Sequence, residues 1–207
     1  MEENSRNQSR NLMLHRRIVA SFRFNPYRDF LAGIELSDLI RRDAWNLLPK
    51  EDTVSVIGPS DPTEDPEGYV VVADSALDHY SGRVDMIVSD LDGPIQKIID
   101  QEDSIKVIHA HGDNIQKLRE VVPRIKGTIL GTTQSIPVRA VKNIGGFTDG
   151  DRSVIMASLL GAKRIFIYGF DYSNPVDGPR DVKFMKLQFA KGIIDNVKSA
   201  EVVYVRR

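Results

Sequence analysis

The strongest constraint on the fold is a series of seven short apolar runs. Each run has four or five residues, is rich in Val and Ile, and shows little alternation between apolar and polar positions. Strands buried on both faces have this pattern, and such strands form largely parallel sheets covered by helices. The runs lie at residues 53–57, 69–73, 85–88, 105–108, 127–130, 164–168 and 201–205.

Helical spacing of apolar residues fills several of the gaps between these runs. The predicted helices are residues 94–102, 114–122, 152–161 and 180–198. An amphipathic entry helix precedes them, capped by Asn25 with Pro26 as its first residue, and its apolar positions continue to Pro49. We expect this helix to cover one side of the core and to carry no chemistry.

The expected fold class is therefore α/β, with a mostly parallel sheet flanked by helices as in Rossmann-like proteins. We predict two parts, an N-terminal segment with the amphipathic helix at residues 1–50 and an α/β catalytic domain at residues 51–207. At 207 residues the chain suits one substantial core.

Cysteine is absent, which excludes disulfides, thiolate zinc sites and cysteine nucleophiles. No apolar run approaches the roughly 20 residues that a bilayer span needs. The polar first ten residues lack the apolar stretch of a signal peptide. We therefore expect a cytoplasmic protein that has no membrane partner.

Charge is distributed unevenly along the chain. Residues 51–103 carry two Lys or Arg and fourteen Asp or Glu, whereas residues 104–207 carry seventeen and nine. This pattern lacks the continuous basic face of a nucleic-acid groove, so no nucleic-acid partner is expected. Carboxylates that hold a divalent cation, with Lys and Arg nearby for phosphate, would explain the pattern; a solvated acidic surface is the alternative.

Small and polar residues follow nearly every apolar run. The clusters are GPSD (58–61), ADS (73–75), SDLDG (89–93), HAHGDN (109–114), GTTQ (131–134) and GFDYS (169–173). In open parallel sheets, ligands bind beyond the carboxyl ends of the strands. The sequence therefore predicts a ligand site that is built from these clusters.

SDLDG places Asp90 and Asp92 two residues apart directly after a run. If the chain is extended there, both carboxylates point the same way and can hold one cation. Paired carboxylates suit Mg²⁺, which usually keeps substrate phosphate oxygens as further ligands. The alternative is an Asp-rich turn that Gly93 closes.

HAHGDN supplies His109, His111, Asp113 and Asn114. One interpretation makes Asp113 a third metal ligand, with the histidines and Asn114 contacting the substrate. A second makes His109 and His111 part of a zinc site, and a third makes Asp113 only the cap of the helix that follows. Asp113 and His111 are both candidates for a general base.

GGFTDGDR, at residues 145–152, is a glycine-rich loop that enters a helix predicted to start near Arg152. A helix N-terminus favours anions, and an arginine there can donate two hydrogen bonds to a phosphate. The loop has neither the Gly-Lys-Ser/Thr ending of a P-loop nor the GxGxxG fingerprint. The phosphate-binding candidates in it are Gly145, Gly146, Thr148, Asp149, Asp151 and Arg152; a flexible turn with an aspartate cap is the alternative.

The remaining clusters give weaker signals. Gly58 and Ser60 are candidates to contact a phosphate or ribose, and Thr132, Thr133 and Gln134 to hydrogen-bond a ring or phosphate. Asp74 and Asp171 each follow a run, and we assign both to the substrate. For Asp74, binding a metal and capping the short helix that follows are the alternatives.

The order of these motifs resembles the archaeal 6-hydroxymethyl-7,8-dihydropterin pyrophosphokinases, a family similar in fold to the catalytic domain of thiamine pyrophosphokinases. The resemblance covers residues 53–172, and HAHGDN and GGFTDGDR are its most specific parts. It implies Mg²⁺-dependent transfer of the terminal diphosphate of ATP to the hydroxymethyl group of a reduced pterin, with release of AMP. The family's acidic metal and substrate residues fall at Asp74, Asp90, Asp92 and Asp113.

Three alternatives remain open from the sequence. They are a thiamine-directed pyrophosphokinase, a glycosyltransferase-like relative on the same scaffold, and a nucleotide-binding module without catalysis. The expected partners are small molecules, ATP and the pterin. A homodimer is expected from relatives of this fold, which often pair.

Overall fold

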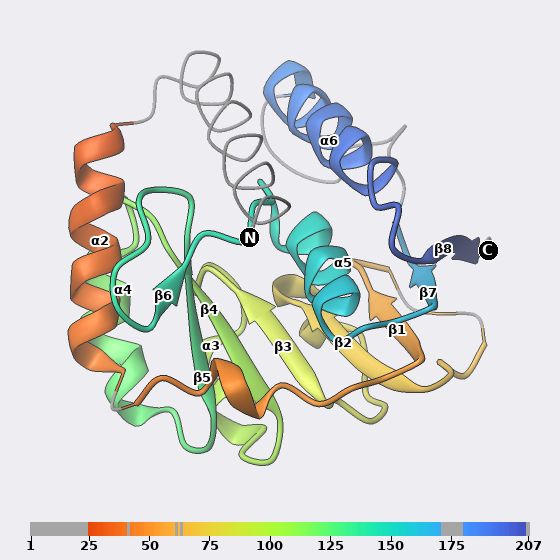
Figure 1. Ribbon diagram of the computed structural model, residues 1–207, viewed down its shortest axis with the longest axis horizontal. Coiled ribbons are helices and arrows are strands. Elements are labelled where there is room, and N and C mark those ends of the chain that lie inside the picture. The colour runs from red at the N-terminus through yellow and green to blue at the C-terminus, as the bar shows by residue number, and fades with distance from the viewer. Residues whose placement is uncertain (1–24, 41, 61, 63, 171–179, 206–207) are drawn as a thin grey trace. The chain divides into compact units, whose positions relative to one another are not determined.

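A computed structural model describes residues 25–40, 42–60, 62, 64–170 and 180–205 (Figure 1). The described residues divide into two compact units. Unit 1 contains residues 25–47 and 89–145, and unit 2 contains residues 48–88 and 146–205. No helix among these residues has both the length and the apolar character that crossing a membrane requires. Both units are α/β, with parallel strands and flanking helices, which confirms the expected fold class.

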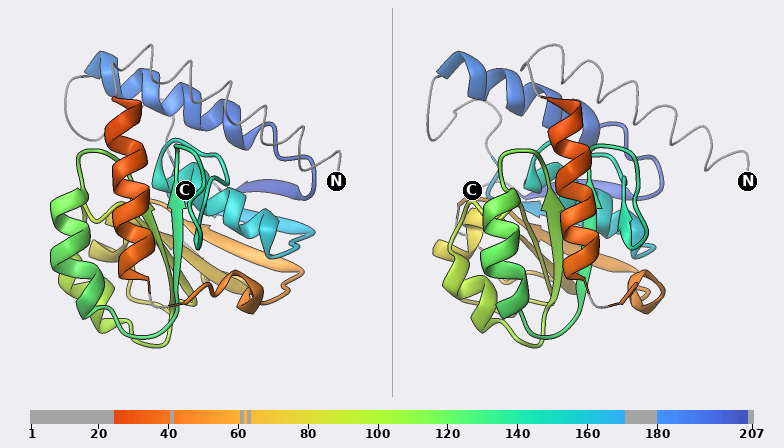
Figure 2. Two further views of the ribbon diagram at one scale, coloured as in Figure 1. Left: turned by 60° about the vertical axis from the view of Figure 1, so that its left-hand side comes forward. Right: turned by 90° about the vertical axis from the view of Figure 1, so that its left-hand side faces the viewer.

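Unit 1 has three parallel strands in the order β4 (Ile105–Ala110), β5 (Ile129–Thr133) and β6 (Val141–Lys142). Its helices are α2 (Pro26–Leu39), α3 (Ile95–Asp100) and α4 (Ile115–Val121), with short 3₁₀ turns η1 (Trp45–Leu47) and η3 (Val122–Arg124). Helix α2 packs on α4 and on β5, as Figure 2 shows from two sides.

Helix α2 begins as the sequence predicts. The Asn25 side chain accepts hydrogen bonds from the backbone N–H groups of Tyr27 and Arg28, and Pro26 fills the first position. The helix ends at Leu39, because Ile40 takes an extended conformation (φ −75°, ψ 119°). The apolar positions that we expected to continue this helix to Pro49 therefore lie outside it, and Trp45–Leu47 form the separate 3₁₀ turn η1.

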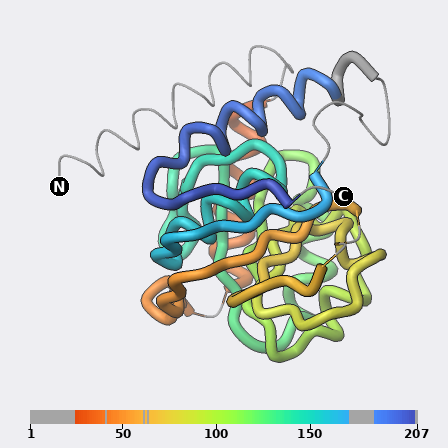
Figure 3. Tube along the Cα trace, turned by 90° about the vertical axis from the view of Figure 1, so that its right-hand side faces the viewer, coloured from red at the N-terminus to blue at the C-terminus, as the bar shows by residue number. Residues whose placement is uncertain are grey.

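Unit 2 has five parallel strands in the order β3, β2, β1, β7 and β8. Their bounds are β1 Thr53–Ile57, β2 Tyr69–Ala73, β3 Met86–Ser89, β7 Arg164–Tyr168 and β8 Glu201–Val205. Figure 3 shows β8, β7 and β1 running side by side. The order reverses between β1 and β7, because the chain builds outward from β1 on one side and from β7 on the other. The carboxyl ends of these two strands are therefore the topological switch point, where open α/β sheets bind ligands.

Helices α5 (Asp149–Leu159) and α6 (Arg180–Ile194) and the 3₁₀ turn η2 (Asp74–Asp78) complete unit 2. Helix α5 packs on β1 and β2, and α6 packs on α5. Strands β1, β2, β3 and β7 are largely buried, and Val54, Val56, Val71 and Ile165 are fully inaccessible to solvent, whereas the edge strand β8 has no buried residue. In these four strands, the lack of alternation thus reflects a sheet that is covered on both sides.

Four predicted strands match the structure at both ends, namely β1, β2, β7 and β8. Strand β5 begins two residues later than predicted, since Gly127 lies in a turn with φ +82°. Helix α5 begins three residues earlier, because Thr148 and not an aspartate is its cap. Helix α6 ends at Ile194 and not at residue 198, and the two-residue strand β6 has too few residues to show a pattern.

Candidate functional site

In unit 1, a tight turn presents Asp90 directly after β3. The Ser89 hydroxyl accepts a hydrogen bond from the Leu91 N–H at 2.8 Å, and Asp90 Oδ1 accepts one from the Asp92 N–H at 3.1 Å. Leu91 has a φ of +67°, in the left-handed region that leucine rarely adopts, and its side chain is fully buried. The expectation of an extended chain at this point is therefore wrong.

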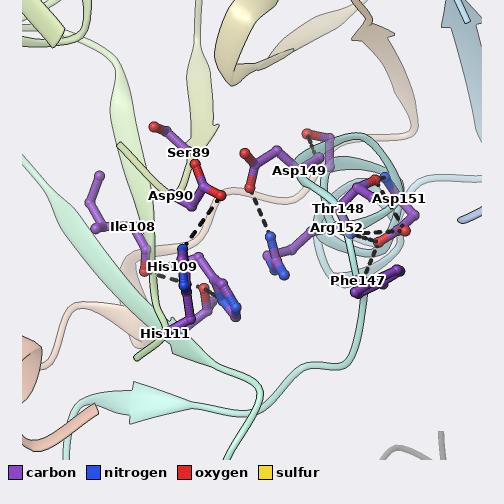
Figure 4. Close-up of polar contacts among 12 residues, drawn as sticks. Ser89, Asp90, Ile108, His109, His111, Phe147, Thr148, Asp149, Asp151 and Arg152 are labelled. Atoms are coloured by element: carbon purple, nitrogen blue, oxygen red, sulfur yellow. Dashed lines mark hydrogen bonds and ion pairs between the residues drawn. The ribbon is translucent and has the colours of Figure 1, made fainter. Parts of the chain in front are cut away.

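Because the chain turns at Leu91, the Asp90 and Asp92 carboxylates have different surroundings. Asp92 is largely exposed and pairs with Lys117 Nζ at 2.7 Å. Asp90 is about one-quarter exposed, and its Oδ2 lies 3.6 Å from His111 Nε2 (Figure 4). The structure thus gives Asp90, and not Asp92, the more enclosed position.

The HAHGDN turn after β4 is built around Asn114, which is 1% exposed. Its Nδ2 donates to the backbone carbonyls of Asp90 and His109, both at 2.7 Å, and its Oδ1 accepts from the His111 N–H at 3.1 Å. Asn114 also precedes α4 as its N-cap residue, although its side chain does not cap the helix. The capping alternative for Asp113 is therefore wrong.

The other polar residues of the turn differ in their exposure and in their hydrogen-bond partners. His111 Nε2 is buried, and no described residue forms a hydrogen bond with it. Asp113 is mostly exposed and lies 3.6 Å from Arg28 Nη1. His109 Nδ1 lies 3.1 Å from the Thr132 hydroxyl, which itself lies 3.2 Å from the Ile108 carbonyl. Among the described residues, the candidate group of metal ligands contains no histidine, which does not favour the zinc alternative.

The predicted residues at the end of β5 have internal partners. Thr133 Oγ1 accepts from the Ser135 N–H at 3.1 Å. Gln134 Nε2 donates to Asp29 Oδ2 at 2.8 Å, and its backbone carbonyl accepts from Asn143 Nδ2. Sequence reasoning missed Asp29, because an aspartate in the first turn of a helix is ordinarily explained by the helix dipole.

In unit 2, the start of α5 forms a capping box. The Thr148 hydroxyl accepts from the Asp151 N–H, while the Asp151 carboxylate accepts from the N–H groups of Phe147 at 2.7 Å and Thr148 at 3.1 Å (Figure 4). Asp151 is fully buried, and this burial raises the pKa of its carboxyl against the lowering effect of Arg152 and the donors. Thr148 and Asp151, predicted to bind ATP, thus build the loop.

Arg152 follows the capping box and is 1% exposed. Its Nη1 donates to Asp149 Oδ1 at 2.8 Å, while Nε and Nη2 are buried and have no hydrogen-bond partner among the described residues. A buried donor without a partner costs about 1–3 kcal/mol, and more when the group is charged. This guanidinium at a helix N-terminus is chemically suited to an anionic ligand.

The glycines of this region make room for Phe170. A Cβ on Gly58 would lie 2.6 Å from the Phe170 ring, and one on Gly150 would collide with the same ring. Gly58 follows β1, Phe170 follows β7, and Gly150 lies in the first turn of α5. The ring therefore places the first turn of α5 at the switch point of unit 2. Sequence reasoning missed Phe170 as the residue that requires Gly58.

The remaining predicted site residues lie at several other positions in the fold. Asp74 follows β2 as the first residue of η2 and is 8% exposed. Ser60 packs against the chain after β7, since a Cβ on Gly169 would meet the Ser60 carbonyl oxygen. Gly145 and Gly146 both have positive φ, and Gly145 donates to Asn143 Oδ1. Asp171 lies outside the described residues. Among the residues that the structure describes, Asp74, Asp90 and Asp149 are carboxylates that could serve as metal ligands.

Residues 73–177 match the family described as "6-hydroxymethylpterin diphosphokinase MptE-like". This stretch is half of the chain, and it includes HAHGDN and GGFTDGDR. The chain belongs to this family. The resemblance inferred from the motifs is thereby confirmed.

Three curated relatives carry the name 6-hydroxymethyl-7,8-dihydropterin pyrophosphokinase. The protein of Methanothermobacter thermautotrophicus is 44% identical over 125 residues, which cover 54% of this chain and 53% of the relative. That of Pyrococcus furiosus is 38% identical over 148 residues, with 64% and 63% covered. That of Methanocaldococcus jannaschii is 36% identical over 151 residues, with 62% of each covered. The chain thus spans between half and two thirds of the length of these MptE-like relatives.

Proposed function

We propose that this MptE-like protein transfers the diphosphate of ATP to 6-hydroxymethyl-7,8-dihydropterin. The hydroxymethyl oxygen bonds to the β-phosphorus of ATP, the bond from that phosphorus to the α,β-bridging oxygen breaks, and AMP leaves. The hydroxyl proton passes to a base. The family match and the names of three relatives support this acceptor. Its partners are then small molecules, while a homodimer and a cytoplasmic location remain predictions.

The observation that carries the proposal is the buried Arg152 guanidinium. Two of its donor nitrogens have no partner among the described residues, and the first turn of α5 lies at the switch point of unit 2. A triphosphate supplies the charge and the acceptor oxygens that such a group requires. We therefore assign Arg152 to the phosphates of ATP, with Asp149 holding its Nη1.

Mg²⁺ fits the donor set, because every candidate ligand is a carboxylate and Mg²⁺ prefers hard oxygen ligands. Asp90 is the first candidate, with Asp74 and Asp149 as further ones. Asp92 and Asp113, also predicted as ligands, pair with Lys117 and Arg28 on the surface. When bound, the ion would neutralise charge that develops on the phosphate oxygens.

His111 is the better candidate for the base that takes the hydroxyl proton. Its Nδ1 lies 3.4 Å from the Asp113 N–H and its Nε2 lies 3.6 Å from Asp90 Oδ2, and a carboxylate this near favours the charged ring that forms when the base takes a proton. Asp113 instead faces Arg28 and solvent. For the pterin itself, Asp74, His109 and Asn114 remain the predicted binding residues. The Asn114 side chain is used in hydrogen bonds within the turn, so Asn114 would act by holding the turn in place.

Product analysis tests the proposal. The protein is incubated with ATP and Mg²⁺ and with 6-hydroxymethyl-7,8-dihydropterin, thiamine or a nucleotide sugar in separate reactions, and the products are identified by mass spectrometry. We expect AMP and pterin diphosphate in equal amounts, with activity lost in EDTA and restored by Mg²⁺. ADP with a pterin monophosphate would contradict diphosphate transfer, and thiamine diphosphate would assign the protein to the thiamine-directed alternative.

A further inference from the structure

Helix α2 has a buried carboxylate that the proposed reaction does not use. Asp29 lies at the end of the first turn of α2 and is 3% exposed. Its Oδ1 accepts a hydrogen bond from the Gly112 N–H at 2.8 Å, and its Oδ2 accepts one from Gln134 Nε2 at 2.8 Å. One side chain of α2 thus joins the turn after β4 to the turn after β5.

The contact at Gly112 is close enough to require glycine. A Cβ on Gly112 would lie 2.5 Å from the Arg28 Cβ and 3.2 Å from the Arg28 backbone carbon. The HAHGDN turn therefore rests directly on the first turn of α2. Arg28 and Asp113 add an exposed ion pair at 3.6 Å, which contributes little by itself.

His111 lies between two fixed points in this turn. On one side its backbone N–H donates to Asn114 Oδ1, and Asn114 also holds the Asp90 carbonyl. On the other side the next residue, Gly112, donates to Asp29. Loss of either anchor frees the backbone that orients the imidazole toward Asp90, and small displacements of a reacting group cost rate.

We propose that Asp29 is a positioning residue, which fixes His111 through Gly112 and fixes Gln134 directly. This inference rests on the proposed function for its effect on rate, but the anchoring itself is independent of the reaction. The entry helix, for which the sequence indicated no chemistry, then supports the site.

Three α2 variants test the proposal. Asp29→Ala removes both acceptors. Asp29→Asn keeps both contacts, since its oxygen can accept from Gly112 and its amide can donate to the Gln134 oxygen after that amide flips. Asp38→Ala is the matched control, because it removes a carboxylate of the same helix that pairs with Arg139 on the surface.

Hydrogen–deuterium exchange gives a readout that does not depend on activity. In Asp29→Ala we expect exchange in residues 111–114 to accelerate about tenfold or more, with β4 residues 105–108 unchanged. Asp29→Asn and Asp38→Ala should exchange like the wild type. Unchanged exchange at 111–114 in Asp29→Ala would overturn the proposal, whether or not the protein makes pterin diphosphate.

Steady-state kinetics then test the effect on the reaction. In Asp29→Ala, kcat should fall about tenfold or more while the KM for ATP stays within about twofold, and Asp29→Asn should recover most of kcat. An accelerated exchange with unchanged kcat would show that the anchor does not position a reacting group. If Asp29→Ala fails to fold, Gln134→Leu removes one of the two contacts from the other side, and unchanged exchange in residues 132–135 would contradict the proposal. Absence of any product from the wild type would refute the proposed function and leave the exchange result standing.

Discussion

The turn after β4 and the start of α5 use their polar residues in the same two ways. In each, one side chain completes the backbone turn with its polar atoms: Asn114 in unit 1 and Asp151 in unit 2. In each, a neighbouring side chain keeps a buried nitrogen that has no hydrogen-bond partner among the described residues: His111 and Arg152. The two motifs thus contain both residues that build a turn and residues that are suited to a ligand.

Residues of the same type within one motif can therefore have different roles, one in building the turn and another in binding a ligand. Asp149 and Asp151 are two residues apart in one motif, yet Asp151 accepts from the backbone and Asp149 holds Arg152. Asp90 and Asp92 also differ in their surroundings, since Asp90 lies beside His111 and Asp92 pairs with the surface Lys117. Variants of the two kinds of residue should therefore fail in different assays.

The largest effect is expected for Asp90→Asn. Loss of a ligand to a Lewis acid should cost several kcal/mol, and about 1.4 kcal/mol is tenfold in rate, so kcat should fall at least about a hundredfold. Circular dichroism and thermal unfolding should match the wild type. Turnover close to that of the wild type at saturating Mg²⁺ would remove Asp90 from the metal site.

The residues that build the turns should affect stability. Asp151→Ala and Asn114→Ala each remove buried hydrogen bonds, so the free energy of unfolding should fall by about 2 kcal/mol in urea titrations. Arg152→Met should change it by less than about 1 kcal/mol, because the variant also removes buried donors that have no partner. A larger loss in Arg152→Met than in Asp151→Ala would reverse the roles we assign in GGFTDGDR.

The two ends of β4 differ in how their buried nitrogen atoms are hydrogen-bonded. His111 Nε2, after the carboxyl end, has no hydrogen-bond partner among the described residues, whereas the ammonium group of Lys106, near the amino end, has several. Lys106 is fully inaccessible to solvent, and its Nζ donates to the carbonyls of Gln101 and Ser104. Burial lowers the pKa of Lys106 to about 8, against the raising effect of Asp103 and Glu102. In the unfolded chain the ordinary lysine pKa is about 10.4.

Between these two values the unfolded chain binds more protons, so stability should rise with pH from about 8 to about 10. Relative to Lys106→Met, the wild type should gain about 1–3 kcal/mol in the free energy of unfolding across that window. Lys126→Met, which removes an exposed lysine paired with Glu102, is the control and should show the same rise as the wild type. Parallel profiles for wild type and Lys106→Met would contradict the lowered pKa.

The smallest effect is expected for Asp92→Asn. Its carboxylate is largely exposed and pairs with Lys117, and surface ion pairs contribute about 0–1 kcal/mol. Activity and the Mg²⁺ concentration for half-maximal rate should stay within about threefold of the wild type. A loss of activity as large as that of Asp90→Asn would instead support Asp90 and Asp92 as joint ligands of one cation.

The strand pattern and the motif order could be predicted because they depend on local sequence. Uniform Val and Ile runs indicate strands, and β1, β2, β7 and β8 have the predicted bounds, although β8 has no buried residue. The roles within motifs could not be predicted, because they depend on distant partners. Asp29 lies 83 residues from Gly112 and 105 from Gln134. The left-handed Leu91 has no glycine signal, so the sequence did not reveal that Asp90 and Asp92 diverge.

The central claim is that the buried guanidinium of Arg152 binds the phosphates of ATP. Isothermal titration of ATP into the wild type, Arg152→Met and Arg164→Met tests it, since Arg164 is an exposed arginine at the amino end of β7. Loss of a charged hydrogen bond of about 2 kcal/mol should raise the Kd about thirtyfold in Arg152→Met. Arg164→Met should leave the Kd unchanged. An unchanged Kd in Arg152→Met would contradict the account and place the phosphates elsewhere in the protein.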